Sequence, residues 1–388
     1  MLYKFFKLNT LMNKTTLISF AFILPAFTFG QIKNPKNLTY EWTTDTSKHI
    51  VDLSELTLTT SKDALPTLDF PKFILKSDKN FNFYEYEPVI AVSYNGESKA
   101  YPLSLLTMYE LSNDSIGGEQ AMVTFCPMCN AAMVFNRKVK KDGQQYLLNF
   151  GISGLLMHND MIMYDKQTNT WWEQLMGEAI VGELAGVELK MMRALIISVK
   201  DYFDRYPEGK ILSPEGIKII DKTTGHRPFH HLNHENSTID SAYFLPEKVD
   251  SRLPPLERVL DIHTEGHTII YPFSSLAKKE VLNEVYDNMY FTIFYHSDMV
   301  SVLDEDTLSK SRKIGSATAF RSYLNGVNYT FKKKDNYFVD DQTHSVWDIT
   351  GYCKEGTLKE KQLMILPHSN HFAFAYLAFF PDAIIYGK

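Results

Sequence analysis

Residues 87–103 read EPVIAVSYNGESKAYPL, and this stretch has the pattern of a β-hairpin. The apolar run Val89-Ile90-Ala91-Val92 precedes Asn95-Gly96, a dipeptide that tolerates the positive φ angles of a type I′ turn. A similar stretch, RVLDIHTEGHTIIYPF, occupies residues 258–273 and has its turn near Glu265-Gly266. The chain therefore contains two versions of one hairpin.

Three further matches follow the two hairpins in the same order. They pair Val123–Cys126 with Phe291–Tyr295, Asp165–Trp172 with Asp340–Trp347, and Tyr206-Pro207 with Phe380-Pro381. The period is far longer than that of solenoid repeats, so we interpret the pattern as a duplicated domain. In this alignment Tyr295 and Asp298 take the places of Cys126 and Cys129.

Strand signals dominate both copies. We predict strands at residues 121–124, 132–135, 146–150 and 161–164, and helices at 103–111, 199–205 and 372–379. The predicted fold class is α+β, mainly β, with two duplicated strand-rich lobes that each carry one or two short helices. The Asp-x-Gln-Thr-x-x-x-Trp segment of both copies predicts a structural turn beside a core Trp, because Asp and Thr side chains accept backbone N–H bonds.

The expected domain organisation follows from these patterns. It comprises a signal peptide (1–30), an N-terminal extension (31–80), a first repeat lobe with the CxxC pair (81–213), a linker strap (214–256) and a second repeat lobe without CxxC (257–388). The linker contains His226, His230, His231 and His234, whose spacing could hold a divalent ion, although an irregular linker is the simpler interpretation.

The N-terminus has the features of an export signal. Lys4, Lys7 and Lys14 precede an apolar run at residues 17–27, and small residues stand just before Gln31. The run is short and contains a proline, so removal is expected rather than membrane anchoring, with an uncleaved tether as the alternative. The mature protein is therefore expected in the periplasm or outside the cell, without stable membrane insertion.

Composition narrows the classes of partner. The formal net charge is −6 and no basic stripe is present, which argues against nucleic acid. The sequence has no phosphate loop, no dinucleotide fingerprint and no Gly-x-Ser-x-Gly nucleophile elbow. The expected partner is a protein or a small molecule of unknown identity.

Two of the three cysteines form a CxxC pair, Cys126-Pro127-Met128-Cys129, and Cys353 stands alone. A CxxC pair is a poor structural disulfide because it closes a very short loop and gains little chain entropy. The same spacing is common in reactive dithiols and in soft-metal sites. We interpret Cys353 as a semi-buried free thiol, with pairing to one of the others as the alternative.

Several motifs together resemble one family. They are Tyr101-Pro102, Asn113-Asp114 with Gly117-Gly118, Val123–Cys129, Phe150–Gly154, Met163–Thr168, Gly177–Gly186, Asp250–Pro255 and His371-Phe372 with Pro381. From about Val51 to the C-terminus the chain resembles the domain-of-unknown-function family 3179. The resemblance implies an exported bacterial protein without an established reaction. Some members of that family carry selenocysteine in the cysteine motif, which would point to redox chemistry. The His-rich segment at 226–234 and Cys353 depart from the family pattern.

Three functions remain open from the sequence. The first is thiol–disulfide oxidoreduction, in which a solvent-accessible Cys126 attacks, Cys129 resolves the intermediate and Pro127 sets the turn between them. The second is binding of a soft metal, copper as Cu(I), by Cys126, Cys129, Met128 and His158. The third is a non-catalytic binding or assembly module in which the pair forms a structural disulfide. We also expect His368 and His371 to cap the helix near Phe372 or to line a cleft.

Overall fold

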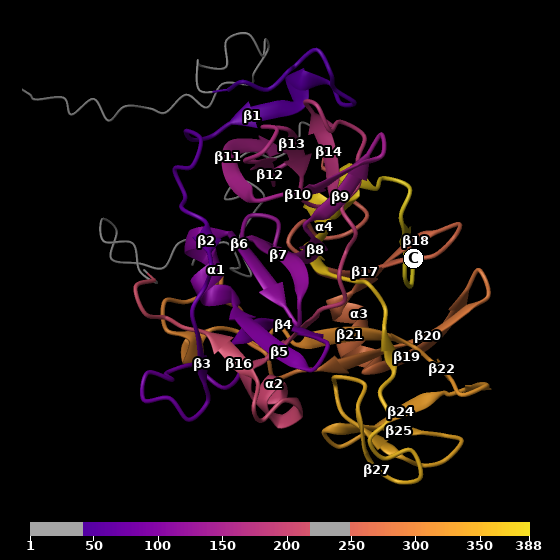
Figure 1. Cartoon of the computed structure of the whole chain (residues 1–388). Coiled ribbons are helices and arrows are strands. Elements are labelled where there is room, and N and C mark those ends of the chain that lie inside the picture. The colour runs from indigo at the N-terminus through magenta and orange to yellow at the C-terminus, as the bar shows by residue number, and fades with distance from the viewer. Residues whose placement is uncertain (1–41, 218–248) are drawn as a thin grey trace, which may run out of the picture.

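The structure is a computed structural model, and it describes residues 42–217 and 249–388 (Figure 1). The predicted signal peptide and the cluster His226, His230, His231 and His234 lie outside the described residues. We call residues 42–217 the N-terminal half and residues 249–388 the C-terminal half. Over these ranges the protein is mainly β, as predicted, with four α-helices.

The N-terminal half contains four sheets and two α-helices. A five-stranded sheet has the order β15 (Leu195–Ser198), β4 (Pro88–Tyr94), β5 (Glu97–Pro102), β16 (Lys210–Leu212), β3 (Phe73–Leu75). A second has the order β1 (Leu56–Leu58), β11 (Phe150–Met157), β12 (Asp160–Asp165), β13 (Trp171–Glu173), β14 (Glu178–Val181). The others are β2 (Leu68–Asp69), β6 (Leu111–Ile116), β7 (Glu119–Cys126), β8 (Ala131–Asn136), and the pair β10 (Gln144–Leu147), β9 (Lys138–Lys141). The helices are α1 (Leu103–Tyr109) and α2 (Val199–Arg205), and a 3-10 turn spans Leu53–Glu55.

The C-terminal half also contains four sheets and two α-helices. The first sheet has the order β29 (Asn370–Phe372), β17 (Arg258–His263), β18 (Thr268–Pro272), β30 (Ile384–Ile385), and the second has the order β19 (Val281–Tyr286), β20 (Met289–His296), β21 (Ser316–Arg321), β28 (Met364–Ile365). The third has the order β24 (Phe331–Lys334), β25 (Tyr337–Asp340), β26 (Val346–Trp347), β27 (Cys353–Glu355). The fourth is the pair β22 (Tyr323–Leu324), β23 (Val327–Asn328). The helices are α3 (Phe273–Lys279) and α4 (Ala373–Phe379), with a 3-10 turn at Leu308–Lys310.

The two halves share an order of elements. The strand order β15-β4-β5-β16 has the same form as β29-β17-β18-β30, and in each half the central hairpin leads into a seven-residue helix. These helices end at Glu110 and Glu280, whose φ angles of 53° and 58° are left-handed. No sheet of the described residues combines strands from both halves. The shared topology is an observation, and the origin of the halves by duplication stays a prediction.

The predicted Asp-x-Gln-Thr turn is confirmed in both halves. Asp165 accepts the Thr168 backbone N–H (2.6 Å) and the Trp172 indole N–H (3.0 Å). Asp340 does the same for Thr343 (2.5 Å) and Trp347 (2.9 Å). Both Trp side chains are fully buried, so each carboxylate joins a tight turn to the core beneath it.

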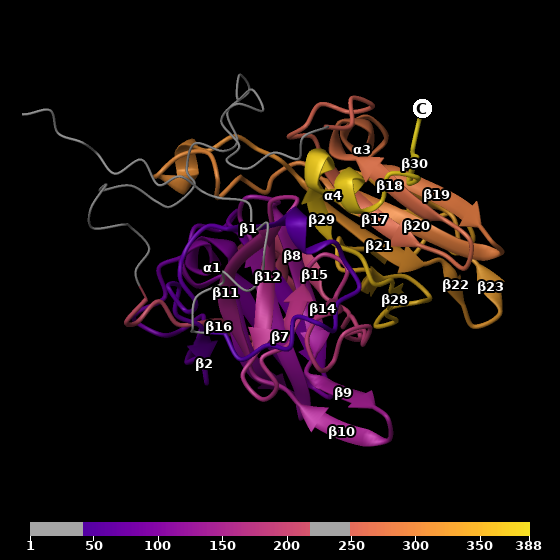
Figure 2. The same ribbon diagram turned by 90° about the horizontal axis from the view of Figure 1, so that it is seen from above.

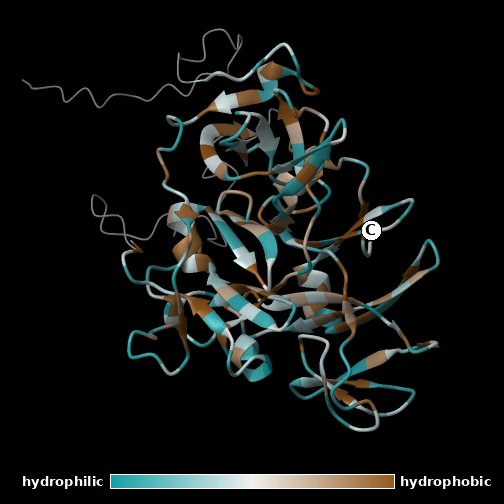
Figure 3. Cartoon of the chain, in the orientation of Figure 1, coloured by the Kyte–Doolittle hydropathy of each residue, from teal (hydrophilic) through white to brown (hydrophobic). Residues whose placement is uncertain are grey.

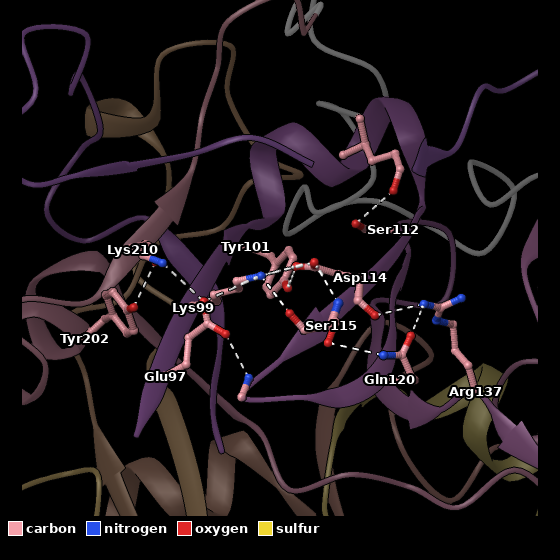
Figure 4. A network of polar contacts seen from close by, with 12 residues as sticks. Glu97, Lys99, Tyr101, Ser112, Asp114, Ser115, Gln120, Arg137, Tyr202 and Lys210 are labelled. Carbon is pink, nitrogen blue, oxygen red and sulfur yellow. Dashed lines mark hydrogen bonds and ion pairs between the residues drawn. The ribbon is translucent and has the colours of Figure 1, made fainter. Parts of the chain in front are cut away.

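A polar network fixes the first hairpin onto β6 (Figure 4). Asp114 receives the Lys99 ammonium at 3.0 Å and the Tyr101 hydroxyl at 2.5 Å. Gln120 and the Asp114 carbonyl accept hydrogen bonds from Arg137 at 2.9 and 3.1 Å. The Lys99 charge is therefore paired with Asp114, and the Arg137 guanidinium is held by neutral oxygen acceptors, so both buried cations have polar partners.

The halves pack on each other through a largely apolar core. Figure 3 shows hydrophobic residues on the strands and helices of both halves. Two views place α4 and β29 of the C-terminal half beside β8 of the N-terminal half (Figures 1 and 2). There the Phe372 N–H donates to the Cys129 carbonyl at 2.7 Å, and the Ser369 hydroxyl donates to the Ala132 carbonyl. We call this contact of β29 with residues 129–132 the β29 seam.

Within the described ranges, no helix is both long and apolar enough to cross a bilayer.

Candidate dithiol site

The CxxC motif forms the turn between β7 and β8, as the strand predictions on either side of it required. Cys126 is the last residue of β7 and pairs with Ala131, the first residue of β8. The Asn130 N–H donates to the Pro127 carbonyl at 3.3 Å, and Asn130 has a φ angle of 52°. This tight turn brings the two thiols into one pocket.

The expectation that Cys126 is accessible to solvent is wrong. Cys126 is 1% exposed and Cys129 is fully buried, and both belong to the core that joins the two halves. The cause is long-range, because the β29 seam covers the turn from the other half of the chain. Both thiols are free, so the pair is not a disulfide in this structure.

Asp160 completes a cluster that the sequence did not indicate. The Cys126 and Cys129 sulfurs and one Asp160 carboxyl oxygen all lie within 4.8 Å of one another. Asp160 begins β12, directly after a turn whose Asn159 carbonyl lies 3.8 Å from the Cys126 sulfur. Over the described ranges this is the one group of three His, Cys, Asp or Glu residues that is close enough to share a metal ion.

A second buried carboxyl, Glu173 at the end of β13, contacts Asp160. The two carboxyl groups hydrogen-bond to each other, which requires a proton between them. Burial raises the pKa of Asp160 well above its ordinary range, and the neighbouring Cys126 adds to this shift. Burial and the Asp160 carboxyl likewise raise the pKa of Glu173. The Leu175 N–H (to Asp160, 3.0 Å) and the Met176 N–H (to Glu173, 2.6 Å) hold the pair in place.

The same surroundings act on the Cys129 thiol. Burial, a hydrogen bond between the two sulfurs and the nearby Asp160 carboxyl raise its pKa well above the ordinary value. Since the thiolate is the nucleophile and the metal ligand, the closed site holds Cys129 as a thiol at neutral pH. Cys129 therefore becomes reactive only when another group accepts its thiol proton.

The structure places the other predicted ligands differently. Met128 lies between the cysteines and packs, partly buried, against the core. His158 lies in the β11–β12 turn with a φ angle of 49°, its Nε2 3.8 Å from a Glu55 oxygen and its ring 5.1 Å from Phe379. His158 is therefore outside the thiol cluster. Cys353 is buried in the C-terminal half, with its sulfur 3.2 Å from the Glu355 carbonyl.

The strand register corrects our alignment of the two halves by one residue. Leu111 pairs with Thr124 in the N-terminal half, and Val281 pairs with Phe294 in the C-terminal half. The position of Cys126 is therefore taken by His296 and not by Tyr295. His296 lines a polar cavity of about 120 Å³ together with Asp348, which follows Trp347 as Glu173 follows Trp172. This position of the fold borders a polar cavity in the C-terminal half and is buried in the N-terminal half.

Asp261, His263 and His371 form a cluster on the paired strands β17 and β29. Asp261 on β17 is nearly buried and lies between His263 Nε2 (3.2 Å) and His371 Nε2 (3.3 Å). Burial alone would disfavour the charged carboxylate, but the adjacent His263 and His371 rings hold the pKa of Asp261 far below its usual range. The helix-capping prediction for His368 and His371 is wrong, because α4 has no side-chain cap. His371 of β29 instead lies against Asp261 of β17, and His368 contacts the Leu366 carbonyl at 2.7 Å.

A protein-family model described as "Protein of unknown function (DUF3179)" matches residues 62–383. The chain belongs to the DUF3179 family. No curated protein and no solved structure matches it. The match to DUF3179 covers both halves, the CxxC turn and both buried carboxyls, so the whole site lies within the family domain. The description of the family names no activity, and function has to be argued from the site.

Proposed function

We propose that this DUF3179 protein is an exported dithiol reductant that acts through Cys126 and Cys129. One observation carries the proposal: two free thiols share a buried pocket with the Asp160 carboxyl. A carboxyl in contact with a thiol can move a proton where water has no access. The proposed export rests on the N-terminal lysines and apolar run, which lie outside the described residues.

The proposed reaction moves two electrons and two protons to a disulfide substrate. The Cys126 sulfur attacks one substrate sulfur, forms a mixed disulfide and breaks the substrate disulfide, and the Cys126 proton goes to the first substrate sulfur, which leaves as a thiol. The Asp160–Glu173 pair, which shares one proton, accepts the Cys129 proton as Cys129 attacks the Cys126 sulfur, and passes it to the second substrate sulfur as that sulfur leaves. The products are a Cys126–Cys129 disulfide and a second substrate thiol. Because Cys126 is buried, these reaction steps require a local opening of the protein at the β29 seam.

The surroundings of the thiols set the direction of the proposed chemistry. The raised pKa of Cys129 means that its surroundings do not stabilise the Cys129 thiolate, and strongly oxidising dithiols depend on a stabilised thiolate. The pair should therefore be a reductant.

The test is a redox titration of the purified protein in dithiol buffers with a metal chelator present, read by mass spectrometry after alkylation. A single two-electron couple is expected for wild type and for Cys353→Ser. Cys126→Ser and Cys129→Ser should abolish both the couple and the reduction of a model disulfide. A pair that stays unreactive as a thiol, or that forms a disulfide no buffer can reduce, would leave only a structural role.

A further inference from the structure

The same pocket contains the elements of a cation site. We propose that Cys126, Cys129 and Asp160 bind a divalent cation of the zinc class, with Glu173 as the carboxyl that orients Asp160. This goes beyond dithiol reduction, because a bound cation would hold both sulfurs reduced and block their oxidation. The observations that carry it are the ligand geometry, the unpaired oxygens around it and the chemistry of the donor set.

The ligand atoms are nearly in place. Bond lengths of about 2.3 Å to sulfur and about 2.1 Å to carboxylate oxygen put two ligands of one tetrahedral zinc ion about 3.4–3.8 Å apart. The three ligand atoms of the pocket already lie within 4.8 Å of one another. Side-chain movements of about 1 Å would therefore bring these three atoms to the spacing of zinc ligands.

Four buried oxygens belong to Asp160 and to residues near it in the chain or in contact with it. Among the described residues, Asn159 Oδ1 and Gln174 Oε1 accept no hydrogen bond, and Asp160 Oδ1 and Glu173 Oε1 have no partner outside the carboxyl pair. Leaving a buried acceptor unpaired costs about 1–3 kcal/mol each, and native structures rarely gather several. Two of these oxygens belong to the carboxyl pair, which needs a proton or a cation between its members. A cation bound beside these oxygens would balance their negative potential.

The donor set selects the class of ion. Two sulfurs with one carboxylate oxygen suit zinc, whereas Cu(I) prefers thiolate and thioether ligands, and magnesium and calcium prefer oxygen alone. Copper, the ion expected from the sequence, depended on Met128 and His158 as ligands. Asp160 takes the third ligand position in place of His158, so the preference moves from copper to zinc.

The experiment uses the reduced, purified protein and two probes, Zn²⁺ measured by metal analysis and Co²⁺ measured by visible absorption. One ion per chain is expected, and Co²⁺ should give thiolate charge-transfer and tetrahedral ligand-field bands. Cys126→Ser, Cys129→Ser and Asp160→Asn should lose binding, while Glu173→Gln should weaken it about 10- to 100-fold, as loss of an orienting partner does. Cys353→Ser and His158→Asn are matched controls that should bind like wild type.

Each outcome decides the proposal. Wild type without thiolate–Co²⁺ bands overturns the site, and Asp160→Asn with wild-type affinity removes the carboxylate ligand. Preferential Cu(I) binding that is lost in Met128→Leu overturns the class of ion. Near-UV circular dichroism identifies variants that fail to fold, and Glu173→Gln then provides the independent reading. Disulfide reduction is scored separately in chelator, so zinc binding without reduction refutes only the proposed function, and reduction without zinc binding refutes only the cation site.

Discussion

At the scale of single residues, equivalent tyrosines of the two halves differ in one hydrogen bond. Tyr101 and Tyr271 are both fully buried at the ends of matching strands. The Tyr101 hydroxyl donates to Asp114 at 2.5 Å, whereas the Tyr271 hydroxyl has no partner among the described residues. Ile269 stands in the place that Lys99 takes two residues before the tyrosine, so the C-terminal half lacks this cation.

This difference predicts opposite effects of one substitution. Tyr101→Phe removes a hydrogen bond to a charged acceptor and should lower the free energy of unfolding by about 1.5–3 kcal/mol. Tyr271→Phe removes a buried hydroxyl that is unsatisfied, and should leave the stability unchanged or raise it. Urea denaturation of both variants measures the two values. Equal losses would mean that the Asp114 network contributes nothing specific to stability.

The residues of the dithiol site show what a sequence can and cannot predict. The CxxC spacing identified Cys126 and Cys129 because both ligands lie on one turn. Asp160 and Glu173 lie far along the chain and reach the thiols only because β12 and β13 pass beneath that turn. The available signal was an acidic residue heading the apolar run Asp160-Met161-Ile162-Met163, a place where burial of the charge needs a reason.

At the scale of elements, local signals predicted the hairpin at Asn95-Gly96 and three of the four α-helices of the described residues, and they missed α3. Asn95 and Gly96 have φ angles of 47° and 82°, as the type I′ turn requires. The predicted helix at 199–205 matches α2 in both bounds, and those at 103–111 and 372–379 end or begin within two residues of α1 and α4. The pairing of β29 with β17 and its contact with the CxxC turn depend on residues more than 100 positions apart, so no local pattern could predict them.

The end of α1 predicts a pH effect on stability. Burial raises the pKa of Glu110, which follows α1 in a left-handed conformation, from 4.5 to about 8. A carboxyl with a raised pKa in the folded state binds more protons there than in the unfolded chain. Its contribution to stability is therefore complete below about pH 4.5 and is lost as the pH rises toward 8.

Glu110→Gln should remove this loss of stability. Between pH 5 and pH 8.5 the variant should fall less steeply in its free energy of unfolding, and it should exceed wild type at the upper end by on the order of 2 kcal/mol. Glu280→Gln is the matched control, because Glu280 ends α3 in the same left-handed conformation but is exposed. Parallel stability curves for wild type and Glu110→Gln would show that Glu110 ionises without cost in the folded protein.

At the scale of the whole molecule, two serines of the C-terminal half donate hydrogen bonds to the N-terminal half. The Ser369 hydroxyl of the C-terminal half donates to the Ala132 carbonyl beside the CxxC turn. The Ser316 hydroxyl donates to the Ile196 carbonyl of the N-terminal half at 2.6 Å, a bond that is not made to residues 129–132. Both serines are buried, so the two bonds form a matched pair that joins the halves.

The route to the dithiol can be tested with this pair of serines. If the thiols become accessible when β29 lifts from residues 129–132, Ser369→Ala should favour that opening by the value of one hydrogen bond. Alkylation of Cys126 and Cys129 in the native, reduced and metal-free protein should then accelerate about 2- to 10-fold. Ser316→Ala removes an equivalent bond that does not cover the turn and should leave the rate of alkylation near that of wild type. Equal acceleration in both variants would indicate that the thiols react only after the halves separate or the chain unfolds globally. Acceleration confined to Ser369→Ala would place the gate of the dithiol at the β29 seam, where a substrate or a metal ion would also have to enter.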